Sequence, residues 1–436
     1  MKTRILFFLL LIVFSNSTKA QWVNEVSGFT PAGYSINDIS VVNSNIVWAT
    51  AYDTAGVAIV NQFTRTLNGG TTWTPDSVGG ASTLDLTSIS AYSKDTAWVS
   101  MVDNNLGGGA IYRTNDGGVS WTSQDTTIFI APGGYPDFVY FFTKNIGVCV
   151  GDSNIGYWEI YTTVNGGTTW SRVPSANIPM NLPGETGSDN VYSVVGNTIW
   201  FGTSIGRIYK STTMGTVWTV ESPGLTTCSR LAFKDALNGI AADGTLLAQT
   251  TDGGTTWVPL SYTGNFYGTN LCYVPGTLGT YVSTGLSVGN NGSSYSIDDG
   301  ATWTNIDTLG HDAVSFFNAT AGWSGGANIS STLGGMYKWN GTFTGIKDYD
   351  YMKDVSMNVF PNPFAEQVTL SVNSEKMVLK NLNIEITDVL GNSILKRSDF
   401  VGNKIVIDRG NLVNGIYFYK VYNSDSIVGA GCLIAQ

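Results

Sequence analysis

The residues of this chain that best suit acid–base chemistry are three aspartates, Asp137, Asp189 and Asp312. Each lies within a residue or two of the start of a short strand that we expect to be the innermost of a repeated unit, as does Asp38. Carboxylates around one opening can act as a pair in glycoside hydrolysis or hold a cation. An aspartate at such a point also satisfies the backbone amides of a turn, and we favour that interpretation. We therefore assign no catalytic residue and keep the three aspartates as candidates.

Three aromatic residues and the single histidine are candidates for ligand contact. Tyr135 lies in one expected loop, and Phe266 and Tyr267 lie in another. We expect both loops to enter the same face as the aspartates, with His311 at that point as well. Exposed rings beside polar groups can stack on a ligand such as a sugar. The alternative is that the rings anchor their loops by burial, and the sequence leaves both interpretations open.

Composition argues against several classes of function. Beyond the first twenty residues the chain has 19 basic and 32 acidic residues, a net charge near −13, which argues against nucleic acid or an anionic membrane as a partner. The four cysteines and the lone histidine lack metal-ligand spacing, so we expect isolated buried thiols, no metal and no cofactor. No later apolar run reaches the length of a transmembrane segment. The cysteines are Cys149, Cys228, Cys272 and Cys432.

The strands that must position these residues belong to repeated units, and each of six units contains an eight-residue sequence, here called a phrase, that recurs along the chain. Its tryptophans, at 73, 121, 170, 218, 257 and 303, are 48, 49, 48, 39 and 46 residues apart. Each phrase contains glycine and, in five copies, an Asn or Asp whose side chain folds back onto the backbone, which is typical of a hairpin turn. These five residues lie in different units, so we assign them a structural role: Asn68, Asp116, Asn165, Asp252 and Asp298. The remaining copy, Ser211–Trp218, has no Asn or Asp at this position.

Ahead of the phrases lies a second recurring feature, a pair of short apolar strands. Seven such pairs can be found between residues 38 and 323, against six phrases. A period of this length fits a four-stranded propeller blade. The sequence therefore predicts an all-β protein, with a seven-bladed β-propeller at residues 21–344. The seventh unit lacks its closing strand, and we expect Trp22–Val26 to supply it by pairing with Gly335–Trp339.

The phrases resemble the Asp-box (BNR) repeat family, which includes sialidases, sortilin receptors, xyloglucan-cleaving hydrolases and a photosystem II assembly factor. The resemblance implies the propeller fold, and because the functions of the family diverge it does not choose among them. A sialidase is disfavoured because no Arg-Ile-Pro occurs and because Arg65 and Arg113 are expected to point outward. Xyloglucanase-like enzymes use two propellers, and here we expect one.

Both ends of the chain have their own character. Residues 1–20 have a basic start, an apolar run of ten and a small final residue, as in a secretory signal peptide. Residues 345–356 are a polar linker, and residues 357–436 have the short alternating strands of a small antiparallel β-sandwich. The motif residues of this tail are Pro361, Asn362, Pro363, Phe364, Gly391, Gly415 and Tyr417.

This tail resembles the type A sorting domain of type IX secretion cargo. One departure is Cys432, where the family usually has Lys. The resemblance implies that outer-membrane secretion machinery handles the tail, removes it and often anchors the cargo on the cell surface. The sequence thus predicts a secreted or surface-exposed propeller that binds a glycan or a protein. The alternatives are a glycoside hydrolase that uses the rim carboxylates and a scaffold for the assembly of envelope proteins.

Overall fold

The computed structural model describes residues 21–436 apart from 31–32, 126, 132, 155, 288, 331–332, 344–354, 375–381, 389–391, 399, 401–402, 411 and 423–426. The expected signal peptide, most of the expected linker and Gly391 therefore lie outside the described residues. The chain divides near residue 346 into two compact units. Apart from one short 3-10 turn, η1 (Ser175–Asn177), every described element is a strand, which confirms the all-β prediction.

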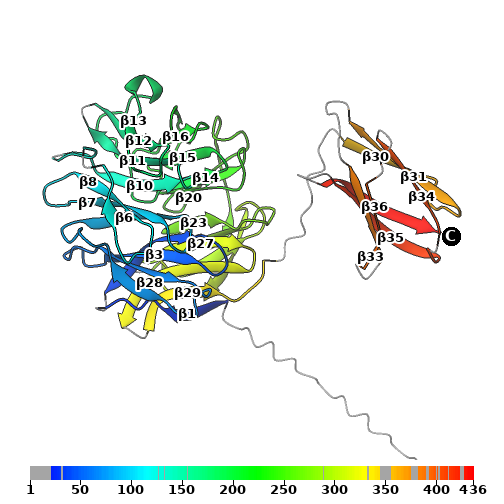
Figure 1. The fold of residues 1–436 in the computed structure, drawn as a ribbon, viewed down its shortest axis with the longest axis horizontal. Coiled ribbons are helices and arrows are strands. Elements are labelled where there is room, and N and C mark those ends of the chain that lie inside the picture. The colour runs from blue at the N-terminus through cyan, green and yellow to red at the C-terminus, as the bar shows by residue number, and fades with distance from the viewer. Residues whose placement is uncertain are drawn as a thin grey trace, which may run out of the picture. The chain divides into compact units, whose positions relative to one another are not determined.

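The described strands of the first unit form seven sheets that follow one another along the chain (Figure 1). The first sheet contains β2 (Tyr34–Val41), β3 (Val47–Asp53), β4 (Gln62–Thr66) and β5 (Thr74–Ser77). The second contains β6 (Asp85–Ala91), β7 (Ala97–Val102), β8 (Gly109–Thr114) and β9 (Thr122–Ser123). The third contains β10 (Pro136–Phe141), β11 (Gly147–Asn154), β12 (Tyr157–Thr163) and β13 (Ser171–Arg172). The fourth contains β14 (Tyr192–Val195), β15 (Thr198–Gly202), β16 (Ile208–Ser211) and β17 (Thr219–Glu221). The fifth contains β18 (Arg230–Phe233), β19 (Gly239–Asp243), β20 (Leu246–Thr250) and β21 (Val258–Pro259).

The sixth and seventh sheets depart from this regular order. The sixth has five strands, because β22 (Thr263–Gly264) pairs in parallel with the outermost strand. Its other members are β23 (Asn270–Tyr273), β24 (Tyr281–Gly285), β25 (Gly292–Ser296) and β26 (Thr302–Asp307). The seventh sheet consists of β27 (Ala313–Asn318), β28 (Ala321–Ser330), β29 (Leu333–Trp339) and, from the other end of the chain, β1 (Trp22–Val26).

The first strands of the sheets lie side by side in chain order, and β27 returns to contact β2. Between β10 and β14 the contact is a stack of Phe138 on Tyr192, with ring centroids 4.4 Å apart. Side-chain oxygens on one first strand accept hydrogen bonds from backbone amides of the next. Ser88 Oγ accepts one from Val139 N at 2.8 Å, for example. These bonds satisfy amides that point sideways out of each sheet, so the seven sheets are joined around a common centre.

Each recurring phrase forms a tight turn, which we call a repeat turn. In the first one, Asn68 Oδ1 accepts hydrogen bonds from Thr66 Oγ1 at 2.9 Å and from Thr72 N at 3.0 Å. The copy without Asn or Asp, Ser211–Trp218, keeps this geometry, because Thr213 Oγ1 accepts a hydrogen bond from Val217 N at 2.9 Å. The structural role expected for the five Asn and Asp residues is consistent with these bonds, which recur at Asp116, Asn165, Asp252 and Asp298.

The repeat turns also connect neighbouring sheets. Trp98 of the second sheet donates from Nε1 to the carbonyl of Gly166, in the repeat turn of the third, at 2.9 Å. Arg113 lies over the Trp98 ring, 5.2 Å from its centroid, and donates to the same carbonyl. Arg65 lies over Trp48 in the same way. Arg65 and Arg113 line neither cavity of the first unit described below; each reaches toward the neighbouring sheet, and a cation over an indole ring is stabilised there.

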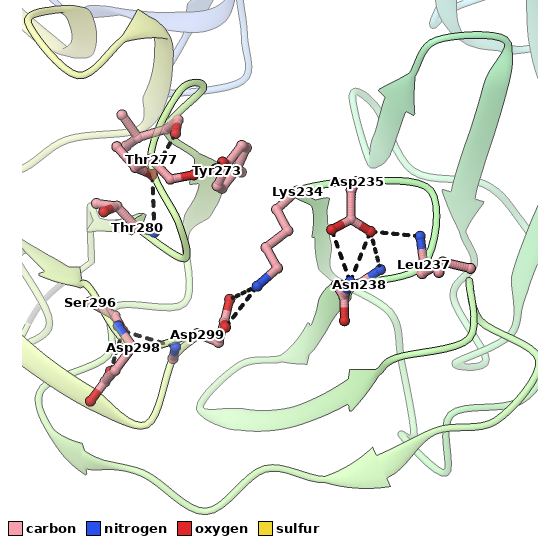
Figure 2. Close-up of polar contacts among 12 residues, drawn as sticks. Lys234, Asp235, Leu237, Asn238, Tyr273, Thr277, Thr280, Ser296, Asp298 and Asp299 are labelled. Carbon is pink, nitrogen blue, oxygen red and sulfur yellow. Dashed lines mark hydrogen bonds and ion pairs between the residues drawn. The ribbon is translucent and has the colours of Figure 1, made fainter. Parts of the chain in front are cut away.

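Figure 2 shows the junction between the fifth and sixth sheets. Lys234, just after β18, pairs with Asp299 in the repeat turn of the sixth sheet, with Nζ 2.7 Å from Oδ1. Asp299 stands where four of the other five copies have a glycine and the fifth has Met214, and its φ is 56°. An aspartate tolerates this conformation better than most residues, and here its carboxylate is also held by the lysine.

The pairing of β1 with β29 joins the two ends of the first unit, as Figure 1 shows. The register runs antiparallel from Trp22 opposite Trp339 to Val26 opposite Gly335. This confirms the pairing predicted from the sequence. The Trp22 side chain is 4% exposed, packs edge-on against Trp339 and donates from Nε1 to Ser293 Oγ at 3.0 Å. The strand is therefore anchored in the sixth sheet as well as in the seventh.

The second unit consists of two antiparallel sheets that share one hydrophobic core. One sheet contains β30 (Val355–Phe360), β31 (Gln367–Ser374) and β34 (Lys404–Asp408), and the other contains β32 (Asn383–Thr387), β33 (Ser393–Arg397), β35 (Gly415–Tyr422) and β36 (Ile427–Ala435). Asn362 clamps the last strand. Its Nδ2 donates to the Cys432 carbonyl at 2.9 Å, and its Oδ1 accepts from Ile434 N at 2.7 Å. Phe364 beside it is buried in the core.

We predict that Trp22→Ala lowers the free energy of unfolding of the first unit by about 3–5 kcal/mol, because it removes a large buried ring at the seam. Tryptophan fluorescence during urea unfolding reports on this unit alone, since all 13 tryptophans lie between residues 22 and 339. Val23→Ala on the same strand is the control. Val23 is 41% exposed, so its change should stay within about 0.5 kcal/mol. Equal effects of the two substitutions would contradict a role for the Trp22 anchor.

Candidate functional site

A cavity of about 670 Å³ opens at the ends of the first strands, and we call it the mouth. Its lining residues come from the first, second, third and fifth sheets and from the segment before β14. Among its lining residues are Tyr52, Asp137, Asp152, Asp189 and Arg230. A second cavity of about 390 Å³ continues between the first strands themselves. Asn37 and Arg230 line both cavities, so they lie where the mouth and the second cavity meet.

Three carboxylates of the mouth influence one another. Asp137 is 6% exposed, and its burial, with the negative charges of Asp152 and Asp189, raises its pKa well above the usual range. Its Oδ2 is buried without a hydrogen-bond partner. Asp189 is exposed to the cavity, yet the surrounding walls reduce its solvation and, with the charge of Asp152, raise its pKa to about 7. Two of the three aspartates proposed as candidates are thus brought together.

The third candidate, Asp312, belongs to a different group. Its carboxylate accepts a hydrogen bond from the Tyr52 hydroxyl, and its pKa is raised by burial. Arg230 lies between the two groups, since both Asp312 and Asp189 stabilise its positive charge. Arg230 donates to the backbone carbonyls of Ser229 and Thr269. The arrangement is a partly buried arginine between one tyrosine-bound carboxylate and a cluster of three others.

Asp38 has a structural partner. Its Oδ2 accepts a hydrogen bond from Ile89 N at 2.9 Å, so it joins the first sheet to the second. Burial nevertheless raises its pKa to about 6. This agrees with the interpretation favoured from the sequence, in which the aspartate binds a backbone amide. The difference is that the amide belongs to the neighbouring sheet and not to a turn.

The residues expected to contact a ligand fall into two sets. Tyr135 lines the mouth and is 36% exposed, whereas Phe266 and Tyr267 are 4% and 7% exposed. Phe266 packs edge-on against Trp303, with centroids 5.0 Å apart. The expectation of ligand contact is therefore corrected for Phe266 and Tyr267: both anchor their loop in the core, because β22 draws that loop onto the sixth sheet.

His311 is also buried, with 0% exposure. Its Nε2 lies 3.0 Å from Asp307 Oδ2, and its Nδ1 lies 2.8 Å from Ser324 Oγ. The ring contacts Trp22. A side chain with no exposed surface cannot touch a ligand in this conformation, so the ligand-binding expectation for His311 is corrected to a role in the core beside β1.

The cysteines and the carboxylates form no metal centre in the described part of the chain. Among the described residues, no group of three or more His, Cys, Asp or Glu side chains has an arrangement suited to a metal ion. Cys149 and Cys228 are buried as expected, Cys272 is partly buried, and Cys432 is exposed. Among the same residues, no helix combines the length and apolar character that crossing a membrane requires.

Sequence reasoning missed three residues of the mouth. Arg230 is the first residue of β18, which is the same position relative to a first strand that drew attention to the aspartates. Tyr52 and Asp152 lie near the ends of second strands, which run antiparallel to the first and finish at the same edge. The signal that could have found them is therefore the strand end itself, applied to both of the inner strands and to every polar residue type.

Comparison with protein families shows that residues 358–430 match the family model of the secretion system C-terminal sorting domain. The tail is therefore such a domain, as predicted, and it implies export by type IX secretion and handling by that machinery. Comparison with curated proteins finds no match.

Solved structures similar to this chain are β-propellers. YCF48 from Cyanidioschyzon merolae is 19% identical, with a TM-score of 0.54 over 74% of this chain and 99% of that one. The GH74 xyloglucanase from Xanthomonas campestris is 10% identical, with a TM-score of 0.52 over 81% of this chain and 59% of that one. U3-55K is 8% identical, with a TM-score of 0.51 over 72% and 97%. At these identities the likeness shows the propeller fold of the first unit and nothing about its activity.

The raised pKa of Asp189 predicts an unusual pH dependence of stability. Between about pH 4, near the usual aspartate pKa of 3.8, and pH 7 the folded state holds a proton that the unfolded state has lost. This contribution to stability is complete below pH 4 and is lost as the pH rises to 7. Asp189→Asn should therefore become progressively more stable than the unmodified protein across this range in urea unfolding. Glu221→Gln removes an exposed carboxylate from β17, outside the mouth, and should show no such trend. A constant difference for Asp189→Asn would contradict the raised pKa.

Proposed function

We propose that this protein is type IX secretion cargo whose seven-bladed Asp-box propeller binds a glycan or a protein partner at the mouth, without catalysis. In this proposal residues 1–20 are a signal peptide, residues 21–344 the propeller, residues 345–356 a linker and residues 357–436 a sorting sandwich. The mature protein is secreted, or it is anchored on the outer cell surface after removal of the sorting domain.

Two features support the assignment of an Asp-box propeller. The seven sheets of the first unit follow one another and meet through their first strands, as blades do. The repeat turns use Asn, Asp or, in one copy, Thr to accept the same backbone hydrogen bond four residues on. The two sheets of the tail, which share one core, support the sandwich.

The single observation that carries the binding proposal is the mouth itself. It combines a sizeable open cavity with groups that the surrounding fold leaves unsatisfied, above all the buried Oδ2 of Asp137. Groups with strongly raised pKa values in a concave site are typical of functional sites. The rest of the mouth offers hydrogen-bonding side chains and one exposed ring, Tyr135.

A glycoside hydrolase is the second candidate. It is favoured by the interaction between Asp137 and Asp189, since hydrolysis requires one carboxyl that keeps its proton near neutral pH and another that is ionised. Against it, of the aromatic residues expected to stack on a sugar only Tyr135 is exposed, whereas Phe266 and Tyr267 are buried. We therefore place binding first.

A glycan array and a pull-down from envelope proteins, both with the mature chain, test the binding proposal. We expect a ligand whose retention falls at least about tenfold in Asp189→Asn, because a hydrogen bond to a charged group is lost. The same variant with chromogenic glycosides tests the alternative. Turnover that disappears in Asp189→Asn would replace the binding proposal with the hydrolase. Retention that is unchanged in Asp189→Asn would move the ligand away from the mouth.

The tail should be dispensable for folding of the propeller and required for export, because the two units have separate cores. A chain that ends at Lys347 should show the same tryptophan-detected urea unfolding as the full chain and remain in the periplasm. Asn362→Ala should also reduce export, because it frees the last strand from its clamp. Appearance of the truncated chain on the cell surface would contradict the role of the tail.

A further inference from the structure

We infer that the mouth binds a basic side chain of a protein partner, and that Asp137, Asp152 and Asp189 receive its cationic group. This inference rests on the proposed binding function and names the chemistry of its ligand. It depends on the charges of the mouth, on which of them the fold already uses, and on what remains without a partner.

The mouth is strongly acidic. Five carboxylates line it against one guanidinium, that of Arg230. Two of the five bind amides of the segment between β3 and β4. Asp53 accepts from the amides of Ala55, Val57 and Ala58 at 2.9–3.0 Å, so it closes its own loop. Asp85 accepts from Val60 N at 2.6 Å. The other three are Asp137, Asp152 and Asp189. Burial raises the pKa values of all three, and the positive charge of Arg230 offsets this only in part, at Asp189.

The missing group is a hydrogen-bond donor at Asp137. A buried carboxylate oxygen without a donor costs stability, and protonation does not remove the deficit, because the acid then needs an acceptor. The local chain cannot supply the donor. Gly187 lies against the carboxyl, where a Cβ would come within 2.0 Å of Asp137 Oδ2, and its own amide donates instead to Asp152 at 2.7 Å. An ammonium or a guanidinium brings several donors together with the opposite charge.

The arrangement suits an organic cation better than a metal ion or a sugar. A metal ion needs oxygens within about 2.6 Å of a single point, and the described carboxylates form no such group. A sugar is best held by exposed rings, and of the three aromatic residues expected here only Tyr135 is exposed. One ring beside several carboxylates is a common surrounding for a cationic side chain. The net charge of −10 also attracts a basic partner during approach.

Arg230 sets how far the cation can enter. It lies between the mouth and the second cavity, where Asp312 and Asp189 stabilise its charge. A second cation that moved deeper would meet this positive charge in surroundings of low dielectric constant. The ligand group should therefore stop at the level of Asp137 and Asp189. That depth fits a side chain projecting from a partner surface.

The test uses the mature chain and four capped nine-residue peptides of Gly and Ser with one central residue: Lys, Arg, norleucine or Gln. Isothermal titration calorimetry should detect the Lys and Arg peptides, with affinity at least about tenfold above that of the two neutral peptides. Asp189→Asn should reduce this affinity about tenfold, and so should Asp137→Asn. Glu221→Gln is the matched control for net charge and should leave the affinity unchanged. Tryptophan-detected unfolding verifies that each variant is folded.

Three outcomes would overturn the inference. The first is equal affinity for the Lys and norleucine peptides, or no binding of any peptide. The second is an equal loss in Glu221→Gln, which would show attraction by net charge alone. The third is a neutral glycan that binds and depends on Asp189 while the basic peptides do not. In that last case the proposed binding function stands and only the cationic ligand is wrong, so the two failures can be distinguished.

Discussion

Backbone hydrogen bonding between β1 and β29 is the interaction on which the rest of the first unit depends. Four of the seven sheets each contribute only a few residues to the mouth, so its geometry depends on how the sheets are arranged in the ring. Tyr52 comes from the first sheet and Asp312 precedes β27 of the seventh, and their hydrogen bond crosses the seam that β1 closes. If that seam opened, Arg230 would lose one of its two carboxylate partners. Ring closure therefore acts on electrostatics at the centre as well as on stability at the edge.

The repeat turns give the ring its tolerance of sequence change. Each turn satisfies its own amides and offers its carbonyl or its glycine surface to the neighbouring sheet, as at Gly166 beneath Trp98. The hydrogen bond that matters is accepted by an oxygen four residues before its donor, and Asn, Asp and Thr can all place one there. Thr213 stands where the other copies have Asn or Asp, and this turn keeps the same hydrogen bond without a carboxylate. This is why a fold so regular can carry an irregular sequence.

Much of the fold was predictable because it follows from period and turn chemistry. The tryptophan spacing predicted the repeated four-stranded sheets. The lack of a closing strand after Trp339 predicted that β1 pairs with β29. The candidate site was predictable only in part. Asp137 and Asp189 lie in the mouth, as the strand-start rule implied, whereas Phe266 and Tyr267 are buried because two residues, Thr263–Gly264, pair in parallel with β26. Such a short pairing has no periodic pattern to reveal it. The burial of His311 depends on Trp22, almost 290 positions away, and likewise has no local sign.

The carboxylates of the repeat turns differ from those of the mouth in the direction of their pKa shifts. At Asp116 and Asp252 the hydroxyls of Ser120 and Thr256 lower the carboxyl pKa to about 2, so the charged form is the one that the turns stabilise. At Asp137 and Asp189 burial raises the pKa, and the charged form is left uncompensated. The ring whose turns stabilise charged carboxylates thus also holds a cluster of poorly satisfied carboxylates at the mouth. A fold selected for stability alone would replace such residues, so their cost is understandable if a ligand supplies the missing donors.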